Sequence, residues 1–281
     1  MRRIGVHTSI SEGLPRSLLR AKELGCDTLQ IFSHNPRGWR IRERNPGEYE
    51  AFRRLRKEFD ISPVFIHSSY LINLASRRAD LRRKSMDMVA SELDIADSVG
   101  ADYVILHTGS ASGEDPAAAR KRAISCLVEV SARGRWRSGI LLENTAGERG
   151  DIASRIEAMG EILEAVPGGF VSGVCIDTCH AFSAGYDMRS AGAADFMAKE
   201  LGNYIGINRV KLIHVNDSGE SLGSGVDRHE HIGRGEIGLE GLRNILTQPV
   251  LVNIPLILET PKRADDDDRK NLSTVKRLII G

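Results

Sequence analysis

The chain has 281 residues, of which 41% are hydrophobic and 27% charged, and its formal net charge is +1. This length suffices for one α/β barrel with a sizeable core, and no linker rich in proline, glycine or serine divides residues 1–281 into two domains. A net charge near zero excludes recognition of a polyanion by the field of the whole molecule, so such a partner needs a local basic surface. No apolar stretch approaches the ~20 residues of a membrane span, and the start MRRIGVH leaves no room for a signal peptide. We therefore expect a cytoplasmic protein without membrane contact.

Short apolar runs predict eight β-strands, in chain order at residues 3–7, 28–33, 63–67, 103–107, 140–143, 173–177, 210–214 and 255–259. Helical spacing of apolar residues recurs between them, at 52–59, 86–96, 124–128, 156–163, 239–246 and 272–279. Strands that are apolar on both faces and alternate with helices indicate a parallel sheet. Eight such units in ~250 residues predict a single closed (β/α)8 TIM barrel.

Six of these strands end in a histidine or a carboxylate, namely His67, His107, Glu143, Asp177, His214 and Glu259. The residue two positions earlier is apolar in each strand, so each polar side chain extends an apolar stripe at one end. The carboxyl ends of parallel strands form one rim of a barrel, where the active sites of this architecture lie. Any one of these residues is explained as a hydrogen-bonded group at a strand end, but six together would repel or become protonated without a cation. We therefore predict a metal site at the C-terminal rim of the strands.

Three further residues enlarge this set of candidate ligands. His180 follows Asp177 by three positions, and Asp227 and His229 are two apart in the glycine-rich loop 216–238. An isolated Asp-x-His is more often a solvated loop, but loops longer than ~12 residues are usually functional or disordered. Imidazole and carboxylate ligands favour zinc or manganese over calcium or magnesium. Nine ligands indicate two or three ions, and closely spaced ions of this kind serve hydrolysis at phosphorus.

The cysteines, Cys26, Cys126, Cys175 and Cys179, match neither a paired CxxC zinc pattern nor a secreted disulfide framework. We expect reduced, partly buried thiols. Cys175 shares a strand face with Asp177, which would bring it near a metal, but packing as a small hydrophobic side chain is favoured. Two roles remain open for His7 and His34: a purely structural role, or a position behind the metal ligands that orients them.

Nine blocks of sequence occur in a characteristic order: IGVHTSISEGL, NPRGWR, HSSYLINLA, LHTGS, LLENTAG, GVCIDTCHAFSAGYD, HVNDS, GSGVDRHEHIGRGEIG and PLILET. Through them, essentially the whole chain resembles the endonuclease IV family of apurinic/apyrimidinic (AP) endonucleases. The central block, residues 173–187, is the most specific.

This resemblance implies a barrel enzyme with three Zn²⁺ ions, Mn²⁺ being an alternative at one of them. It implies a monomer acting on double-stranded DNA in base excision repair. The enzyme would hydrolyse the phosphodiester 5′ to an abasic site, leaving a 3′-hydroxyl and a 5′-deoxyribose phosphate, and would also trim blocked 3′ ends. The implied ligands are His67, His107 and Glu143 for the first ion, Glu143, Asp177, His214 and Glu259 for the second, and His180, Asp227 and His229 for the third.

Catalytic and DNA-contacting residues follow from the same resemblance. Two residues are candidates for orienting or deprotonating the attacking water: Glu143, which we assign primarily as a bridging ligand, and Glu259. Arg37, Tyr70 and Leu71 would lie in loops that enter the base stack and hold a bent duplex with the lesion turned out. Without the resemblance, a second interpretation is equally open: Tyr70 and Leu71 would pack beneath a loop, and Arg37 would be an ordinary surface charge.

The acidic run Asp265–Asp268 follows the last predicted strand. As a helix cap it is favourable, whereas near DNA it would repel phosphate.

Two other functions remain open from the sequence. A metal-dependent sugar isomerase or epimerase on a similar barrel would carry acids and histidines at its strand ends, but it does not need His180, Asp227 and His229. A DNA-damage binder without catalysis would keep zinc for structure, and the complete ligand set argues against it.

Overall fold

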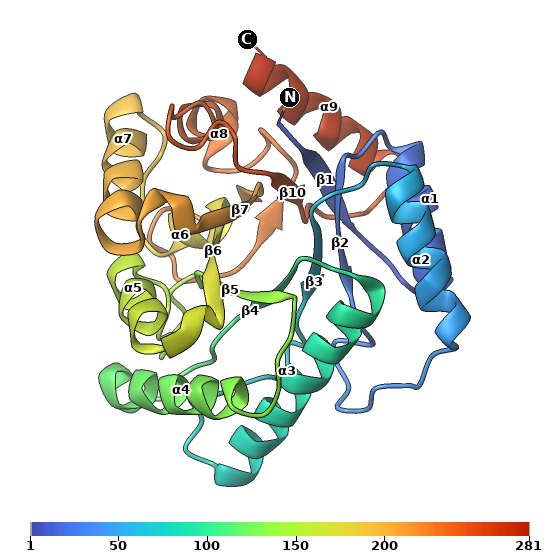
Figure 1. The fold of residues 1–281 in the computed structure, drawn as a ribbon. Coiled ribbons are helices and arrows are strands. Elements are labelled where there is room, and N and C mark those ends of the chain that lie inside the picture. The colour runs from blue at the N-terminus through green and yellow to red at the C-terminus, as the bar shows by residue number, and fades with distance from the viewer. Residues whose placement is uncertain (1, 281) are drawn as a thin grey trace.

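Eight parallel strands close into a barrel in this computed structural model, which describes residues 2–280. The strands are β1 (Ile4–Thr8), β2 (Thr28–Phe32), β3 (Val64–His67), β4 (Tyr103–Leu106), β5 (Gly139–Glu143), β6 (Val171–Asp177), β7 (Val210–His214) and β10 (Leu256–Leu258). Successive strands are neighbours, and β10 closes the ring against β1 (Figure 1). The predicted (β/α)8 barrel and its eight strands are confirmed. The ladders of β4 and β10 end one residue before His107 and Glu259, which therefore begin loops.

Helices cover the outside of the ring (Figure 1). They are α1 (Leu14–Glu23), α2 (Pro46–Glu58), α3 (Ala79–Val99), α4 (Pro116–Ser131), α5 (Ile156–Ala165), α7 (Ala191–Glu200), α8 (Gly238–Leu246) and α9 (Asp267–Ile280). The short helix α6 (Thr178–Ser183) is buried and directly follows the C-terminal end of β6. Short turns η1 (Pro167–Gly169), η2 (Leu201–Ile205) and η3 (Ile207–Arg209) lead into β6 and β7, and a hairpin of β8 (Asp217–Ser218) and β9 (His229–Glu230) stands beyond β7.

Local sequence explains where several helices begin and end. The side chains of Asn45 and Asp115 accept hydrogen bonds from backbone N–H groups of the first turns of α2 and α4, and proline follows each cap. Gly100 ends α3 in the left-handed conformation, with φ of 70°. Neither α1 nor α7 was predicted from the sequence. In α7 the apolar signal is weak because alanine dominates the helix and its one aromatic residue, Phe196, is 59% exposed.

The interior of the barrel is a small, separate apolar cluster. It consists of the residues that precede the six strand-end ligands by two positions, each 0% exposed: Phe65, Ile105, Leu141, Cys175, Leu212 and Ile257. The ring of Tyr103 stacks on that of Phe65 with centroids 5.9 Å apart. Because strand side chains alternate, this cluster forms the floor beneath the polar rim. Cys175 packs as predicted, and burial raises the pKa of its thiol to about 12.

The remaining buried side chains fill the layer between strands and helices, with Val6, Leu29 and Ile66 among them. All four cysteines are free and buried. None of the helices within residues 2–280 combines the length and apolarity needed to span a bilayer.

Replacing Phe65 by alanine should empty part of the barrel floor. We expect the free energy of unfolding to fall by ~3–5 kcal/mol, because a cavity would remain in a closed ring of strands that cannot collapse onto it. Urea denaturation measures the change. The control Phe196→Ala removes an equally large side chain that is 59% exposed on α7 and should alter stability by less than ~0.5 kcal/mol. Equal losses in the two variants would show that Phe65 does not support the barrel.

Candidate metal centre

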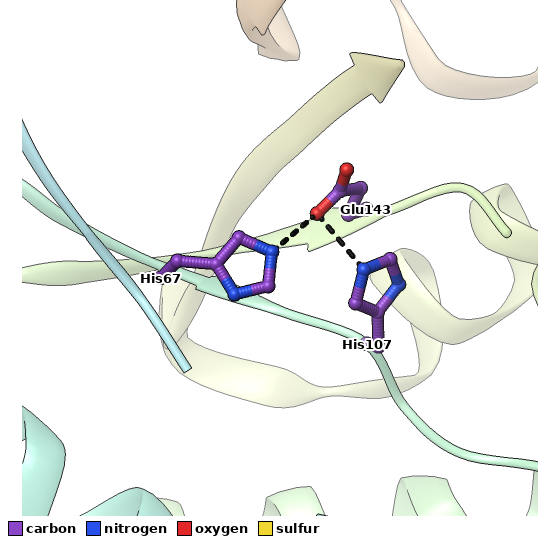
Figure 2. Close-up of side chains that lie close together, drawn as sticks. All are labelled: His67, His107 and Glu143. Carbon is purple, nitrogen blue, oxygen red and sulfur yellow. Dashed lines mark hydrogen bonds and ion pairs between the residues drawn. The ribbon is translucent and has the colours of Figure 1, made fainter. Parts of the chain in front are cut away.

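Glu143 at the end of β5 lies between His67, at the end of β3, and His107, which directly follows β4 (Figure 2). Its Oε2 is 3.2 Å from Nε2 of His67 and 3.1 Å from Nε2 of His107. The donor atoms of the three residues all lie within 4.8 Å of one another, and the Glu143 side chain is fully buried. This first group has the donor types and spacing of a zinc site.

The other oxygen of Glu143 faces a second group of donors. Its Oε1 is 2.8 Å from Nδ1 of His214, and that nitrogen is 3.1 Å from Oε2 of Glu259 and 3.9 Å from Oδ2 of Asp177. Donor atoms of these four residues again lie within 4.8 Å of one another. Glu143 thus presents one oxygen to each group, which is the arrangement of a carboxylate shared by two cations.

A third group joins His180 on α6 to Asp227 and His229 from the long loop after β7. Oδ1 of Asp227 is 3.2 Å from Nε2 of His180 and 3.3 Å from Nε2 of His229. Both imidazole nitrogens are buried and make no hydrogen bond among the described residues. Buried polar atoms without a partner are costly, so these two indicate a missing ligand such as a cation. All nine ligands predicted from the sequence therefore meet at one end of the barrel.

Hydrogen bonds on the far side of the imidazoles preset their tautomers. Nδ1 of His67, His180 and His229 lies 2.9, 2.9 and 3.2 Å from a backbone carbonyl oxygen. A carbonyl only accepts, so Nδ1 carries the proton and Nε2 offers its lone pair to the group. His214 is reversed, because its Nε2 is 2.7 Å from Oε1 of Gln30 and its Nδ1 faces the donors. These tautomers fit the binding of cations.

The ionisation of the side chains in the cluster also fits the binding of cations. Burial by itself raises the pKa of Glu143, but the imidazoles of His107 and His214 outweigh it and hold the pKa well below its usual range. Burial likewise lowers the pKa of His180, and Asp177 and Asp227 outweigh it to raise the pKa well above its ordinary value. Glu143 is therefore ionised deep in the protein, where nearby positive charge stabilises it.

Three residues hold the ligands in place: His7, whose role the sequence left open, and Gln30 and Asn216, which were not identified from the sequence. Nε2 of Gln30 donates to Oε1 of Glu259 (2.6 Å), and Nδ1 of His7 lies 3.1 Å from the same oxygen. Nδ2 of Asn216 donates to Oδ2 of Asp177 (2.6 Å). Gln30 is fully buried. Its one signal in the sequence was a polar residue inside an otherwise apolar strand.

Asp217 folds the loop that carries the third group. Its buried carboxylate accepts hydrogen bonds from the backbone N–H groups of Gly233, Gly235, Ile237 and Gly238, at 2.8 to 3.2 Å. The chain approaches so closely that a Cβ on Gly235 would lie 2.2 Å from the carbonyl oxygen of Ser218. The glycines of HIGRGEIG therefore serve this turn.

A pocket of about 220 Å³ opens over the donors. Besides ligands of the three groups it is lined by His7, Phe32, Tyr70 and Lys262. A larger hollow of about 1360 Å³ lies at the opposite, N-terminal end of the strands, around Tyr103 and Gly139, and none of the nine ligands lines it. The chemistry of the donors therefore makes the smaller pocket the candidate active site.

Of the three predicted DNA contacts, Tyr70 lines this pocket and is 60% exposed, with its ring 5.4 Å from that of Phe32. Arg37 is exposed and Leu71 half-buried, and neither lines the pocket. Their two loops are joined, because Oγ of Ser69 and the backbone N–H of Tyr70 both donate to the carbonyl oxygen of Pro36, at 2.8 and 3.2 Å.

The two unassigned histidines differ in role. His7 lies directly behind Glu259. His34 is buried in the loop after β2, where Nδ1 is 2.8 Å from Oγ of Ser33 and Nε2 is 3.2 Å from the carbonyl oxygen of Gly38. His34 is therefore a structural residue of that loop.

Comparison with known proteins gives concordant matches. The family model of the xylose isomerase-like TIM barrels matches residues 18–278. Probable endonuclease 4 of Methanoculleus marisnigri is 39% identical, with 98% of each chain covered, and that of Aquifex aeolicus is 37% identical, with 98% of this chain and 96% of the other covered. The crystal structure of endonuclease IV from Thermus thermophilus has a TM-score of 0.87 and 36% identity, covering 99% of each chain. A D-tagatose 3-epimerase-like protein shares the fold alone, at a TM-score of 0.74 and 21% identity.

Glu92 on α3 supports the two joined loops from below and gives a prediction of pH dependence. Its Oε1 accepts a hydrogen bond from the backbone N–H of Ser69 (3.0 Å), and its Oε2 has no partner among the described residues. Burial raises the pKa of Glu92 to about 8, from 4.5. Between these values the folded chain holds a proton that the unfolded chain has released, so the stability contributed by Glu92 falls as pH rises.

In the variant Glu92→Gln the side chain cannot ionise, so the variant should not show this fall in stability with rising pH. Relative to the variant, the wild type should lose stability from about pH 4.5 to about pH 8, by no more than ~1.4 kcal/mol per pH unit. Denaturation midpoints of both proteins across this range measure the difference. A difference that stays constant with pH would mean that Glu92 titrates alike in both states.

Proposed function

This chain belongs to the endonuclease IV family of AP endonucleases, and we propose that it hydrolyses the DNA phosphodiester on the 5′ side of an abasic nucleotide. The resemblance seen in the sequence blocks is thereby confirmed as family membership. The proposed products are a 3′-hydroxyl and a 5′-deoxyribose phosphate. Trimming of blocked 3′ ends is proposed as a second use of the same site, because it requires the same attack on a phosphate ester.

The observation that carries the proposal is the presence of three donor groups around one pocket, two of them sharing Glu143. We assign His67, His107 and Glu143 to the first Zn²⁺, Glu143, Asp177, His214 and Glu259 to the second, and His180, Asp227 and His229 to the third, with Mn²⁺ as the alternative at one site. When bound, such ions activate water and neutralise the charge on the leaving oxygen. The third group is what a sugar isomerase or epimerase does not need.

The two glutamates divide the catalytic work in this proposal. Both oxygens of Glu143 face donor groups, so we assign it as the bridging ligand. The Glu259 side chain is 15% exposed and lines the pocket, and Gln30 and His7 hold its Oε1. Glu259 is therefore placed to orient the attacking water or accept its proton.

Selection of an abasic nucleotide follows from the size of the pocket. Its volume of about 220 Å³ is below the ~300–1,000 Å³ of typical small-molecule pockets, which suits a bare sugar better than a whole nucleoside. Tyr70 at the pocket, with Arg37 and Leu71 in the adjoining loops, would hold the duplex with the abasic nucleotide turned out. A missing base lowers the cost of this distortion. We further propose that the enzyme works as a cytoplasmic monomer.

A duplex with one tetrahydrofuran abasic analogue tests the function. We expect the zinc-loaded protein to cut 5′ to the analogue, to leave the undamaged duplex intact, and to lose activity after prolonged chelation. The variant Glu143→Gln should be folded, by circular dichroism, but inactive, because the carboxylate shared by two groups would lose its charge. Full cleavage by the chelated protein or by Glu143→Gln would refute the metal-dependent mechanism.

Loss of the third group should be visible in the metal content. His229→Ala removes one of its three donors, so we expect about one zinc ion fewer per chain and cleavage slowed by at least ~100-fold through weaker neutralisation of the leaving oxygen. Elemental analysis of the purified protein gives the count. Phe196→Ala, on the distant α7, serves as the control. An undiminished zinc count in His229→Ala would contradict the assignment.

A further inference from the structure

Lys262 is the one lysine or arginine among the described residues that line the pocket over the donors. Its Nζ donates to the backbone carbonyl oxygen of His7 (2.7 Å) and to Oδ2 of Asp268 (2.8 Å). An ammonium group has three donors, and the third N–H of Lys262 has no partner within residues 2–280. The side chain is 40% exposed and lines the pocket.

The acidic run before α9 explains how Lys262 is held. Asp267 fixes the turn before α9, since its Oδ2 accepts hydrogen bonds from the backbone N–H groups of Arg263 and Ala264, at 2.8 and 2.7 Å. Asp268 points inward and is only 3% exposed. Its Oδ2 is shared by Lys262 and by Arg20, whose guanidinium nitrogen lies 3.5 Å away. One carboxylate thus serves two cations and leaves one positive charge in excess.

A second hollow of about 280 Å³ adjoins the pocket and shares Lys262 with it. Ser9, Ser11, Arg16 and Arg20 line it, together with Glu12 and Glu23. Both glutamates pair with Arg16, at 3.3 and 3.6 Å, and all three side chains are exposed. Lys262 and Arg20 lie apart from these pairs, where the two hollows meet, and share only the buried Asp268.

We propose that Lys262 binds a DNA backbone phosphate next to the one that is cleaved, at the junction of the metal pocket and the Arg20 hollow. This rests on the proposed function. Asp268 and Arg20 act through Lys262: the buried carboxylate fixes the ammonium group, and the guanidinium prevents its full neutralisation. A phosphate oxygen accepts the third N–H in a charge-assisted hydrogen bond.

Replacing Lys262 by methionine keeps the length of the side chain and removes its charge. Because the contact exists before and during the reaction, we expect KM for the tetrahydrofuran duplex to rise roughly tenfold, with kcat changed less than about twofold. The salt dependence of duplex binding, plotted as log K against log salt, should become shallower by ~0.9 for the one lost phosphate contact. Lys262→Arg should restore both values, and Asp268→Asn should raise KM with kcat preserved.

The chain supplies matched controls. Lys270 pairs with Asp266 of the same acidic run at 2.8 Å, but both are exposed and neither lines the pocket. Lys270→Met and Asp266→Asn should therefore keep the wild-type KM and salt slope. If Lys262 merely ties α9 to β1, Lys262→Met will lose thermal stability while KM and the salt slope stay at wild-type values, and that result would overturn the proposal.

Fluorescence anisotropy of the same labelled duplex keeps this inference separate from the proposed function. If the wild type binds the duplex without cutting it, the proposed function fails, yet the difference in salt slope between wild type and Lys262→Met still decides the role of Lys262. If the wild type cuts and the two slopes agree, the proposed function stands and the phosphate contact is refuted. An unchanged zinc content in Lys262→Met shows that the metal groups are intact.

Discussion

The arrangement of the whole site depends on one buried carboxylate, that of Glu143. Its oxygens face two different groups of imidazoles and carboxylates, and the apolar floor of the barrel beneath it can solvate none of them. Ionised groups in such a place are stabilised only by nearby positive charge and by well-formed hydrogen bonds. The closed ring of parallel strands supplies the geometry, since every strand delivers its last inward-facing side chain to the same rim.

Around Glu143, neutral polar residues restrict the freedom of the ligands. Gln30 connects His214 to Glu259, and Asn216 fixes Asp177. Backbone carbonyls hold the protonated nitrogens of three other imidazoles, so that the lone pairs point inward before any ion binds. A site prepared in this way loses little entropy on binding metal, and it disfavours protonation of the wrong nitrogen.

Recognition of the substrate is left to the edge of the pocket, where the charge is arranged locally. The net charge of the chain is only +1, and the acidic run near the rim would be expected to repel DNA. Instead Asp267 accepts hydrogen bonds from the backbone of the turn before α9, and Asp268 is buried beneath two cations. The run thus orders basic side chains at the pocket rather than opposing them. On the other loops, Glu92 joins the Ser69 segment to α3 and so fixes the support of Tyr70.

The sequence by itself determined the strands and the positions of the nine candidate ligands, because both depend on short-range rules. Apolar runs mark the strands, and a side-chain period of two places Phe65 on the floor and His67 on the rim of the same strand. Alternation of strands with helices then fixes the barrel, whose parallel strands bring the ends together. The short helix α1 and the alanine-rich α7 were missed, since neither was recognised by apolar spacing.

Tertiary structure alone decided how the ligands are held and where charge remains. Gln30 contacts His214 across 184 residues of sequence, and Lys262 contacts His7 across 255. Asp217 and Asp268 look like ordinary acids in the sequence, yet one organises a loop and the other is buried between two cations. No periodicity encodes such pairs, because they are set by closure of the ring, which brings residues from opposite ends of the chain within hydrogen-bonding distance.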